Sequence, residues 1–96
     1  MITTKQFLKI GSDGSIKFHA NSAGYGVPTV SLSGFTFTID LPIAISKDHR
    51  FVIPIADENG QTFLQEQAGS DTQIKIVTEN DVGEGEPIAF SVAIMS

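Results

Sequence analysis

Apolar and polar residues alternate along most of this chain, which is the pattern of half-buried β-strands. The clearest run is Phe35–Asp40, in which aromatic or branched residues alternate with polar ones. Similar runs occupy residues 15–20, 29–33, 73–77 and 88–95, and no helical pattern extends over ten residues. Seven or eight short strands separated by turns predict an all-β fold, an antiparallel β-sandwich or jelly-roll-like domain.

The 96 residues are enough for one hydrophobic core, because domains usually span roughly 50 to 200 residues. We therefore expect a single β-sandwich domain over 1–96, in which 1–14 form an N-terminal arm plus a hairpin turn. The glycines of Gly11–Gly14 suit a tight reversal, which joins the segment Gln6–Ile10 to the strand over 15–20 as a first hairpin. Asn59-Gly60 is a strong hairpin signal and predicts a further strand near Gln61–Leu64.

For two of the predicted strands, the sequence pattern also indicates which faces are buried. Ile16, Phe18 and Ala20 share one face, which predicts that this face is buried. Phe51–Ile55 is apolar on both faces and is therefore expected to be covered on both sides. Pro54 lacks an N–H and fits an edge strand or a bulge better than the interior of a sheet.

The last strand has two different faces. Large apolar residues form one face without interruption: Ile88, Phe90, Val92 and Ile94. Ala89, Ser91 and Ala93 lie opposite them, followed by Met95. Three small residues in a row indicate a close approach by a second sheet or by a neighbouring subunit, and we take them as a candidate oligomer interface.

Charge and composition exclude several classes of function. The net charge of −5 divides into +2 over residues 1–56 and −7 over residues 57–96, which disfavours nucleic acid as a partner. The chain has no cysteine and therefore no disulfide or thiolate chemistry. No stretch has the apolar length of a signal peptide or a membrane span, so we expect a soluble chain without a membrane partner.

Catalytic and metal-binding patterns are weak. His19 and His49 have no second histidine at ligand spacing, and metal sites need several converging ligands. The paired carboxylates in Gly-rich loops lack the burial that tunes a catalytic pKa. We therefore predict no catalytic residue, no metal, no cofactor and no enzyme activity.

A binding site is more plausible in the loops. Tyr25 is the sole tyrosine and lies between two glycines, so its ring either extends into solvent to stack on a sugar or folds back over the edge of the core. The turn residues Asp57, Glu58 and Asn59 supply hydrogen-bonding groups. We take these four residues as candidate ligand-binding residues.

The segments 34–39, 51–55 and 87–94 together resemble the small C-terminal β-domains of bacteriophage tail fibres and tailspikes. The resemblance covers about residues 15–96 and lies in short Thr/Ser-rich strands, Gly-rich turns and a final hydrophobic strand. It implies a trimeric virion protein that acts in fibre assembly and in attachment to a host-surface glycan or to other virion proteins. The alternatives are a phage capsid decoration protein and a small carbohydrate-binding module.

Overall fold

The computed structural model describes all residues, 1–96, as eight β-strands and two short 3-10 turns. None of its helical segments has the length and apolar character needed to cross a membrane. The strands are β1 Thr4–Ile10, β2 Ile16–Asn21, β3 Thr29–Ser33, β4 Thr36–Asp40, β5 Phe51–Ala56, β6 Gly60–Leu64, β7 Gln73–Asn80 and β8 Phe90–Met95. The 3-10 turns are η1 Lys47–His49 and η2 Glu66–Ala68.

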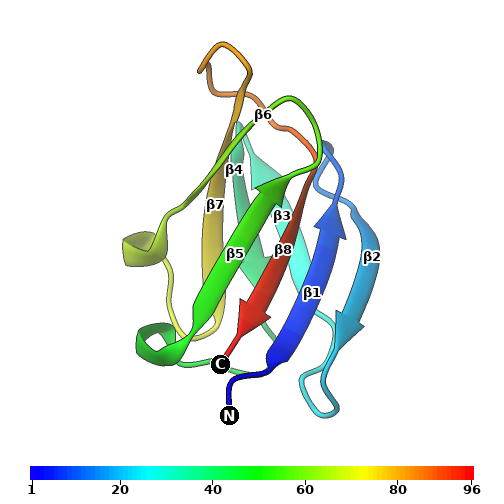
Figure 1. Cartoon of the computed structure of the whole chain (residues 1–96), viewed down its shortest axis with the longest axis vertical. Helices are drawn as coiled ribbons and strands as arrows, with labels where there is room; N and C mark the ends of the chain where they lie inside the picture. The colour runs from blue at the N-terminus through cyan, green and yellow to red at the C-terminus, as the bar shows by residue number, and fades with distance from the viewer.

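The strands form two four-stranded antiparallel sheets that pack face to face. Sheet A has the order β2-β1-β8-β5, and sheet B has the order β3-β4-β7-β6. In Figure 1 sheet A lies toward the viewer, and β3 and β4 of sheet B lie behind it. The predicted antiparallel sandwich of seven or eight strands is confirmed.

The core lies between the two sheets and is built from alternate residues of the inner strands. Phe37 of β4 and Phe90 of β8 are both fully buried, with their rings edge to face at 4.9 Å between centroids. The other members of the core cluster are Leu8, Ile10, Ile39, Leu41, Ile45, Ile74, Ile76, Val92 and Ile94. Period-two alternation places these side chains on the facing sides of both sheets.

The N-terminal segment is a central strand. Only the first three residues precede β1, which pairs with β2 on one side and with β8 on the other. The expected hairpin with Gln6–Ile10 as its first strand is confirmed, and because this strand contributes Leu8 and Ile10 to the core, no arm extends over residues 4–10. The hairpin turn after it is present, and Gly14 has a φ of 85°, which a residue with a side chain rarely adopts.

The predicted orientation of Phe18 is wrong because β2 contains a bulge. Ile10 pairs with Ile16 and Lys9 pairs with Phe18, so Lys17 is an extra residue on β2. One extra residue moves every later side chain to the other face. Ile16 therefore packs against the core, whereas Phe18 lies on the outer face of sheet A with 52% of its surface exposed.

β5 lies at an edge of sheet A, as Pro54 suggested, but it is covered on one side only. Phe51, Ile53 and Ile55 are 55%, 47% and 61% exposed. The turn at Asn59-Gly60 does not close a hairpin, because β5 pairs with β8 in sheet A and β6 pairs with β7 in sheet B. This turn instead carries the chain from one sheet to the other.

The paired phenylalanines of the core provide a test of the packing. Phe37→Ala removes a fully buried ring that contacts both sheets, and such a cavity lowers the free energy of unfolding by about 3–5 kcal/mol. Val82→Ala alters a loop residue that is 71% exposed and should change this free energy by less than about 0.5 kcal/mol. Urea unfolding of both variants at one protein concentration measures the difference, and equal effects would contradict the assignment of the core.

Candidate functional site

The residues predicted as a ligand site lie at two opposite ends of the sandwich. Tyr25 follows the end of β2, whereas Asp57, Glu58 and Asn59 follow the end of β5. The pairings in sheet A make β2 and β5 run in opposite directions, as the arrows in Figure 1 show. The structure therefore does not bring Tyr25 and the acidic turn together, and one site cannot include both.

Tyr25 adopts the second of the two predicted placements. Its side chain is partly buried and packs against the core cluster. The loop that carries it is held by Gln6, which is 1% exposed and whose Nε2 donates to the carbonyl oxygens of Tyr25 at 3.2 Å and Gly26 at 3.0 Å. The Oε1 of Gln6 lies 2.8 Å from Nε2 of His19. The ring is thus part of the structural edge of the sandwich.

The acidic turn after β5 is bound to the start of β8. The Ser91 hydroxyl donates to Oδ2 of Asp57 at 2.7 Å, and Nζ of Lys9 lies 4.0 Å from the same oxygen. Lys9 also donates to the Ser91 hydroxyl at 3.0 Å. The backbone N–H of Ala89 donates to Oε1 of Glu58 at 2.8 Å. These carboxylates therefore stabilise the turn, and Asn59 remains exposed beside them.

A shallow hollow of about 420 Å³ lies at the same end of the molecule, between the β1–β2 turn and the β5–β6 turn. Its charged lining residues are Lys9, Lys17, Asp13, Asp57 and Glu58. Two ammonium groups against three carboxylates leave the lining nearly balanced, and several of these groups already bond to one another or to the backbone. The hollow therefore presents a polar surface without a strong preference for a ligand of either charge.

Asp13, which lines this hollow, has a lowered pKa. The Ser15 hydroxyl and the Ser15 backbone N–H both donate to its Oδ1, at 2.6 and 3.0 Å. These bonds stabilise the charged form and lower the pKa of Asp13 from its ordinary value, with a smaller contribution from Lys17. The arrangement closes the β1–β2 turn and is a turn motif of the kind aspartate commonly forms.

The two histidines lie in separate places. His19 contacts Gln6, and Nδ1 of His49 lies 3.1 Å from the hydroxyl of Ser46. No group of three or more His, Asp or Glu side chains is arranged so that it could hold a metal ion.

The acidic half of the chain does produce one acidic end. The β5–β6 turn, the end of β7 and the loop before β8 lie together, joined by the Asp57 N–H bond to Ala89 and the pairing of Gln61 with Glu79. Six acidic residues lie here, namely Asp57, Glu58, Glu79, Asp81, Glu84 and Glu86. Glu66 and Asp71 lie in the β6–β7 connection, at the other end.

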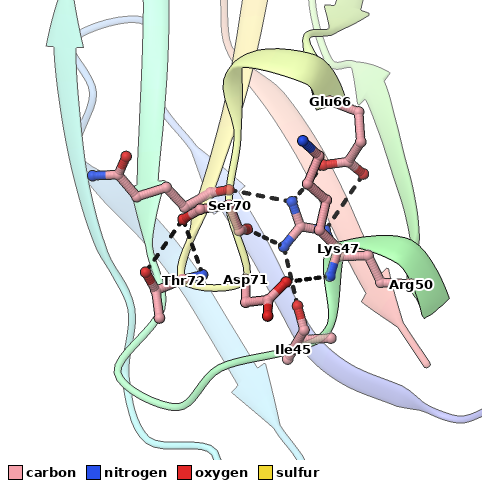
Figure 2. A network of polar contacts seen from close by, with 8 residues as sticks. Ile45, Lys47, Arg50, Glu66, Ser70, Asp71 and Thr72 are labelled. Carbon is pink, nitrogen blue, oxygen red and sulfur yellow. Dashed lines mark hydrogen bonds and ion pairs between the residues drawn. The ribbon is translucent and has the colours of Figure 1, made fainter.

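Arg50 is a buried charged residue that sequence reasoning missed. Its side chain is fully buried and lies between the β4–β5 and β6–β7 connections (Figure 2). The guanidinium donates to the carbonyl oxygens of Ile45 at 3.2 Å, Ser70 at 2.7 Å and Gln73 at 3.2 Å. It also forms a two-point ion pair with the carboxylate of Glu66.

A signal for this role is present in the sequence. Arg50 directly precedes a strand that is apolar on both faces, and it has the parity of Val52 and Pro54, which the structure places inward. A charged residue at a core parity indicates a paired, buried charge. The partner could not be predicted because Glu66 is distant in sequence and lies in a turn of no regular pattern.

The outer face of sheet A is apolar. By register and alternation it carries eight apolar side chains: Phe7, Phe18, Ala20, Phe51, Ile53, Ile55, Ala93 and Met95. The polar residues among them are Thr4, which pairs with Met95, Lys9, which lies 6.0 Å from the centre of the Phe7 ring, and Ser91. Phe7 and Phe18 pack edge to face at 6.1 Å between centroids. We call this surface the apolar face.

The outer face of sheet B has the opposite character. Its central rows are polar and bonded to one another, with Lys75 donating to the Thr38 hydroxyl at 3.1 Å and Gln73 donating to Asp40 at 2.8 Å. Phe63 and Val77 are its apolar members, and the other residues are Thr29, Ser31, Ser33, Thr36, Thr38, Asp40, Gln61, Gln73, Lys75 and Glu79. An antiparallel sheet with one solvated face normally looks like this, and the apolar face is the exception.

The candidate interface residues lie on or beside the apolar face. Ser91 and Ala93 belong to β8 and point away from sheet B, since Phe90, Val92 and Ile94 take the inward positions. Ala89 precedes β8 and borders the hollow. The second sheet therefore does not cover these small residues, and Ser91 is instead buried by its bonds with Lys9 and Asp57.

Comparison with protein families, curated proteins and solved structures finds no match to this chain.

The buried guanidinium predicts a large loss of stability on substitution. Arg50→Met keeps the apolar stem but leaves three backbone carbonyls and Glu66 without their donor, which should lower the free energy of unfolding by about 3 kcal/mol. Lys47→Met lies three residues away on an exposed turn and should change it by less than about 0.5 kcal/mol. Urea unfolding measures both, and an Arg50→Met variant as stable as the parent would contradict this role.

The Asp13 turn predicts a change in pKa on loss of one donor. Ser15→Ala removes the hydroxyl that bonds Oδ1, so the pKa of Asp13 should rise toward its ordinary value, as followed by NMR titration of the carboxyl carbon. A pKa that is lower in the folded than in the unfolded chain stabilises the fold above the unfolded pKa. That stabilisation is lost as the pH falls through the folded pKa, and it should be smaller in Ser15→Ala. Ser12→Ala serves as the control, and an unchanged Asp13 pKa in Ser15→Ala would contradict the assignment.

Proposed function

We propose that this chain is a structural or adhesion module of a bacteriophage virion that acts as a homotrimer, in tail-fibre or tailspike assembly and attachment to the host surface. The observation that carries the proposal is the apolar face, on which four large side chains are each about half exposed. These are Phe18, Phe51, Ile53 and Ile55. The other side of this sheet already packs the core, so these exposed side chains are available for a contact with another molecule.

The size of the apolar face supports an assembly role. With about 200 Å² for each large side chain and roughly half of it exposed, the four residues present on the order of 400 Å² of apolar surface. The largest apolar patch of a typical monomer has about 300–600 Å² and is often functional, so a patch of this size is consistent with an interaction site. These four side chains share the outer face of one sheet, which favours a defined contact surface.

The distribution of charge supports the same role. The acidic end lies in loops at the ends of strands, whereas the apolar face carries one ion pair between Lys9 and Asp57 at its margin. Copies that pack through sheet A would keep their acidic loops at an end of the assembly, where a host-surface glycan or another virion protein can reach them. The same arrangement suits a capsid decoration protein, which is the alternative within this class.

The carbohydrate-binding alternative has less support. It relied on Tyr25 as a stacking ring and on the acidic turn as its polar partner. Tyr25 packs against the core edge, and the turn lies at the other end of the sandwich. Neither half of that site presents an exposed aromatic platform beside hydrogen-bonding groups.

The mass of the protein in solution tests the proposal. Sedimentation equilibrium or light scattering at micromolar concentration should give three times the 10.3 kDa of one chain. The expected reason is that burial of the apolar face offsets the entropy lost on association. A strict monomer over this concentration range would overturn the assembly proposal, and a stable dimer would overturn its threefold form.

A further inference from the structure

We infer that β3 is an open edge of sheet B that accepts one extended, uncharged segment of another polypeptide as an added strand. The inference deepens the proposed function and rests on it for the identity of that polypeptide, which would be another virion protein. The added segment would pair with β3 and make sheet B five-stranded. Addition of a strand to an exposed sheet edge is a general mode of peptide recognition.

The two sheets have four edge strands, and three of them are protected from further pairing. β5 contains Pro54, which has no N–H to donate to a ladder. The Thr62 hydroxyl of β6 donates to the carbonyl oxygen of Pro54 at 3.4 Å, so the edges of β5 and β6 lie against one another. β2 contains a bulge at Lys17. Proline, bulges and lysine are the features that keep an edge strand from pairing with another chain.

β3 has none of these features. Its residues, Thr29–Ser33, include no charged residue and no proline, and its register with β4 is unbroken. Pro28 directly precedes the strand and Gly34 directly follows it, so the regular edge is five residues long. A regular, uncharged edge strand is a template for pairing with a further strand. β3 is therefore the edge of this protein at which a segment can be added.

The register of β3 identifies the backbone groups that would hold the added segment. A two-residue turn joins β3 to β4, so Ser33 and Thr36 beside it exchange both of their backbone hydrogen bonds. Alternation then directs the N–H and C=O groups of Val30 and Leu32 away from β4 and toward the free edge. No backbone hydrogen bond outside the strand ladders uses these four groups. An antiparallel segment can bond all of them.

The side chains of β3 define the chemistry of the segment. Val30 and Leu32 pack against the core cluster but are only partly buried, whereas the hydroxyl residues Thr29, Ser31 and Ser33 are exposed. Residues that exchange bonds with Val30 and Leu32 place their side chains on the same inner side of the sheet. Apolar side chains at these positions would cover the exposed parts of Val30 and Leu32. Small polar residues between them would continue the row of hydroxyls.

The neighbouring edge favours a single segment over a second copy of the sandwich. β5 and β6 meet at one side of the molecule, so β2 and β3 lie at the other side. The β1–β2 turn reaches β3, since a Cβ on Gly14 would lie 3.1 Å from the Cβ of Leu32. A second sandwich placed edge to edge along β3 would bring its own bulged β2 and Lys17 against this β2, which such features oppose. A single extended segment brings no second sheet.

Hydrogen exchange of the backbone amides tests the inference with a synthetic peptide. In the peptide three threonines alternate with two valines, between terminal lysines that keep it soluble. In the free protein the N–H groups of Val30 and Leu32 should exchange rapidly, whereas those of Ser31 and Ser33 are protected by β4. Millimolar peptide should slow exchange at Val30 and Leu32 by at least about tenfold, because both groups then donate to the peptide.

Two control peptides leave the protein unchanged. One has the same composition but groups its threonines and its valines, which removes the alternation. The other carries N-methyl groups on both valines, which removes the donors that would bond Val30 and Leu32. Both should give no protection. Absence of protection with the original peptide, or equal protection with the N-methylated one, would overturn the inference.

A pair of variants tests the same edge from the side of the protein. Val30→Pro removes an N–H that the fold does not use and should abolish the effect of the peptide at Leu32. Val30→Ala keeps the N–H and should retain the effect. Circular dichroism checks that both variants are folded, and the N-methylated peptide keeps the test decisive if Val30→Pro is not. Full protection of Leu32 in a folded Val30→Pro variant would contradict strand addition.

The mass of the protein in solution separates this inference from the proposed function. A monomer that binds the peptide overturns the proposed assembly and supports the open edge at β3. A trimer in which the peptide protects neither Val30 nor Leu32 supports the assembly and overturns the inference. If Val30→Pro lowers the mass of the assembly, β3 pairs with a second copy, and a separate segment is the wrong occupant.

Discussion

The bonds made by the buried guanidinium of Arg50 hold one end of the sandwich together. The β4–β5 connection crosses from sheet B to sheet A, and the β6–β7 connection turns back within sheet B. Both contain irregular backbone whose carbonyls cannot join a sheet, and such groups must find partners when they are buried. Arg50 supplies them from one side chain, and Glu66 balances its charge. Burial of a guanidinium carries a desolvation cost, which these bonds offset.

The same residue determines which way β5 faces. Because Arg50 points inward and directly precedes the strand, alternation turns Phe51 outward and places Ile53 and Ile55 beside it. A shift of one residue here would exchange the inner and outer faces of the strand. The bulge at Lys17 acts in the same way on β2, where it turns Phe18 outward. Two local features of the backbone, one in each edge strand of sheet A, therefore create the apolar face.

Sequence patterns predicted where the strands of this protein lie better than they predicted which strands pair with one another. The alternation in Phe35–Asp40 and the glycines of the β1–β2 turn depend on neighbouring residues, and both were read correctly. The bulge at Lys17 arises where β2 pairs with β1, so the alternation of residues within β2 alone does not predict it. The Asn59-Gly60 turn has the local chemistry of a hairpin, but the sheet joined by its second strand depends on distant residues of β7. The small residues on β8 were recognised, whereas the large residues that flank them came from strands distant in sequence.

The fold separates the charges of the chain, with little charge on the apolar face and six carboxylates at the acidic end. Charge repulsion between copies is weakest where the surface carries least charge, and the apolar face is that surface. Six carboxylates lie at one end, so copies arranged about an axis parallel to their strands would bring these groups to one rim. Repulsion at that rim falls with salt, because exposed charges are screened within about 10 Å at 0.1 M. In the proposed assembly the apolar contact and the repulsion at the acidic rim would therefore oppose one another, and the ionic strength would set their balance.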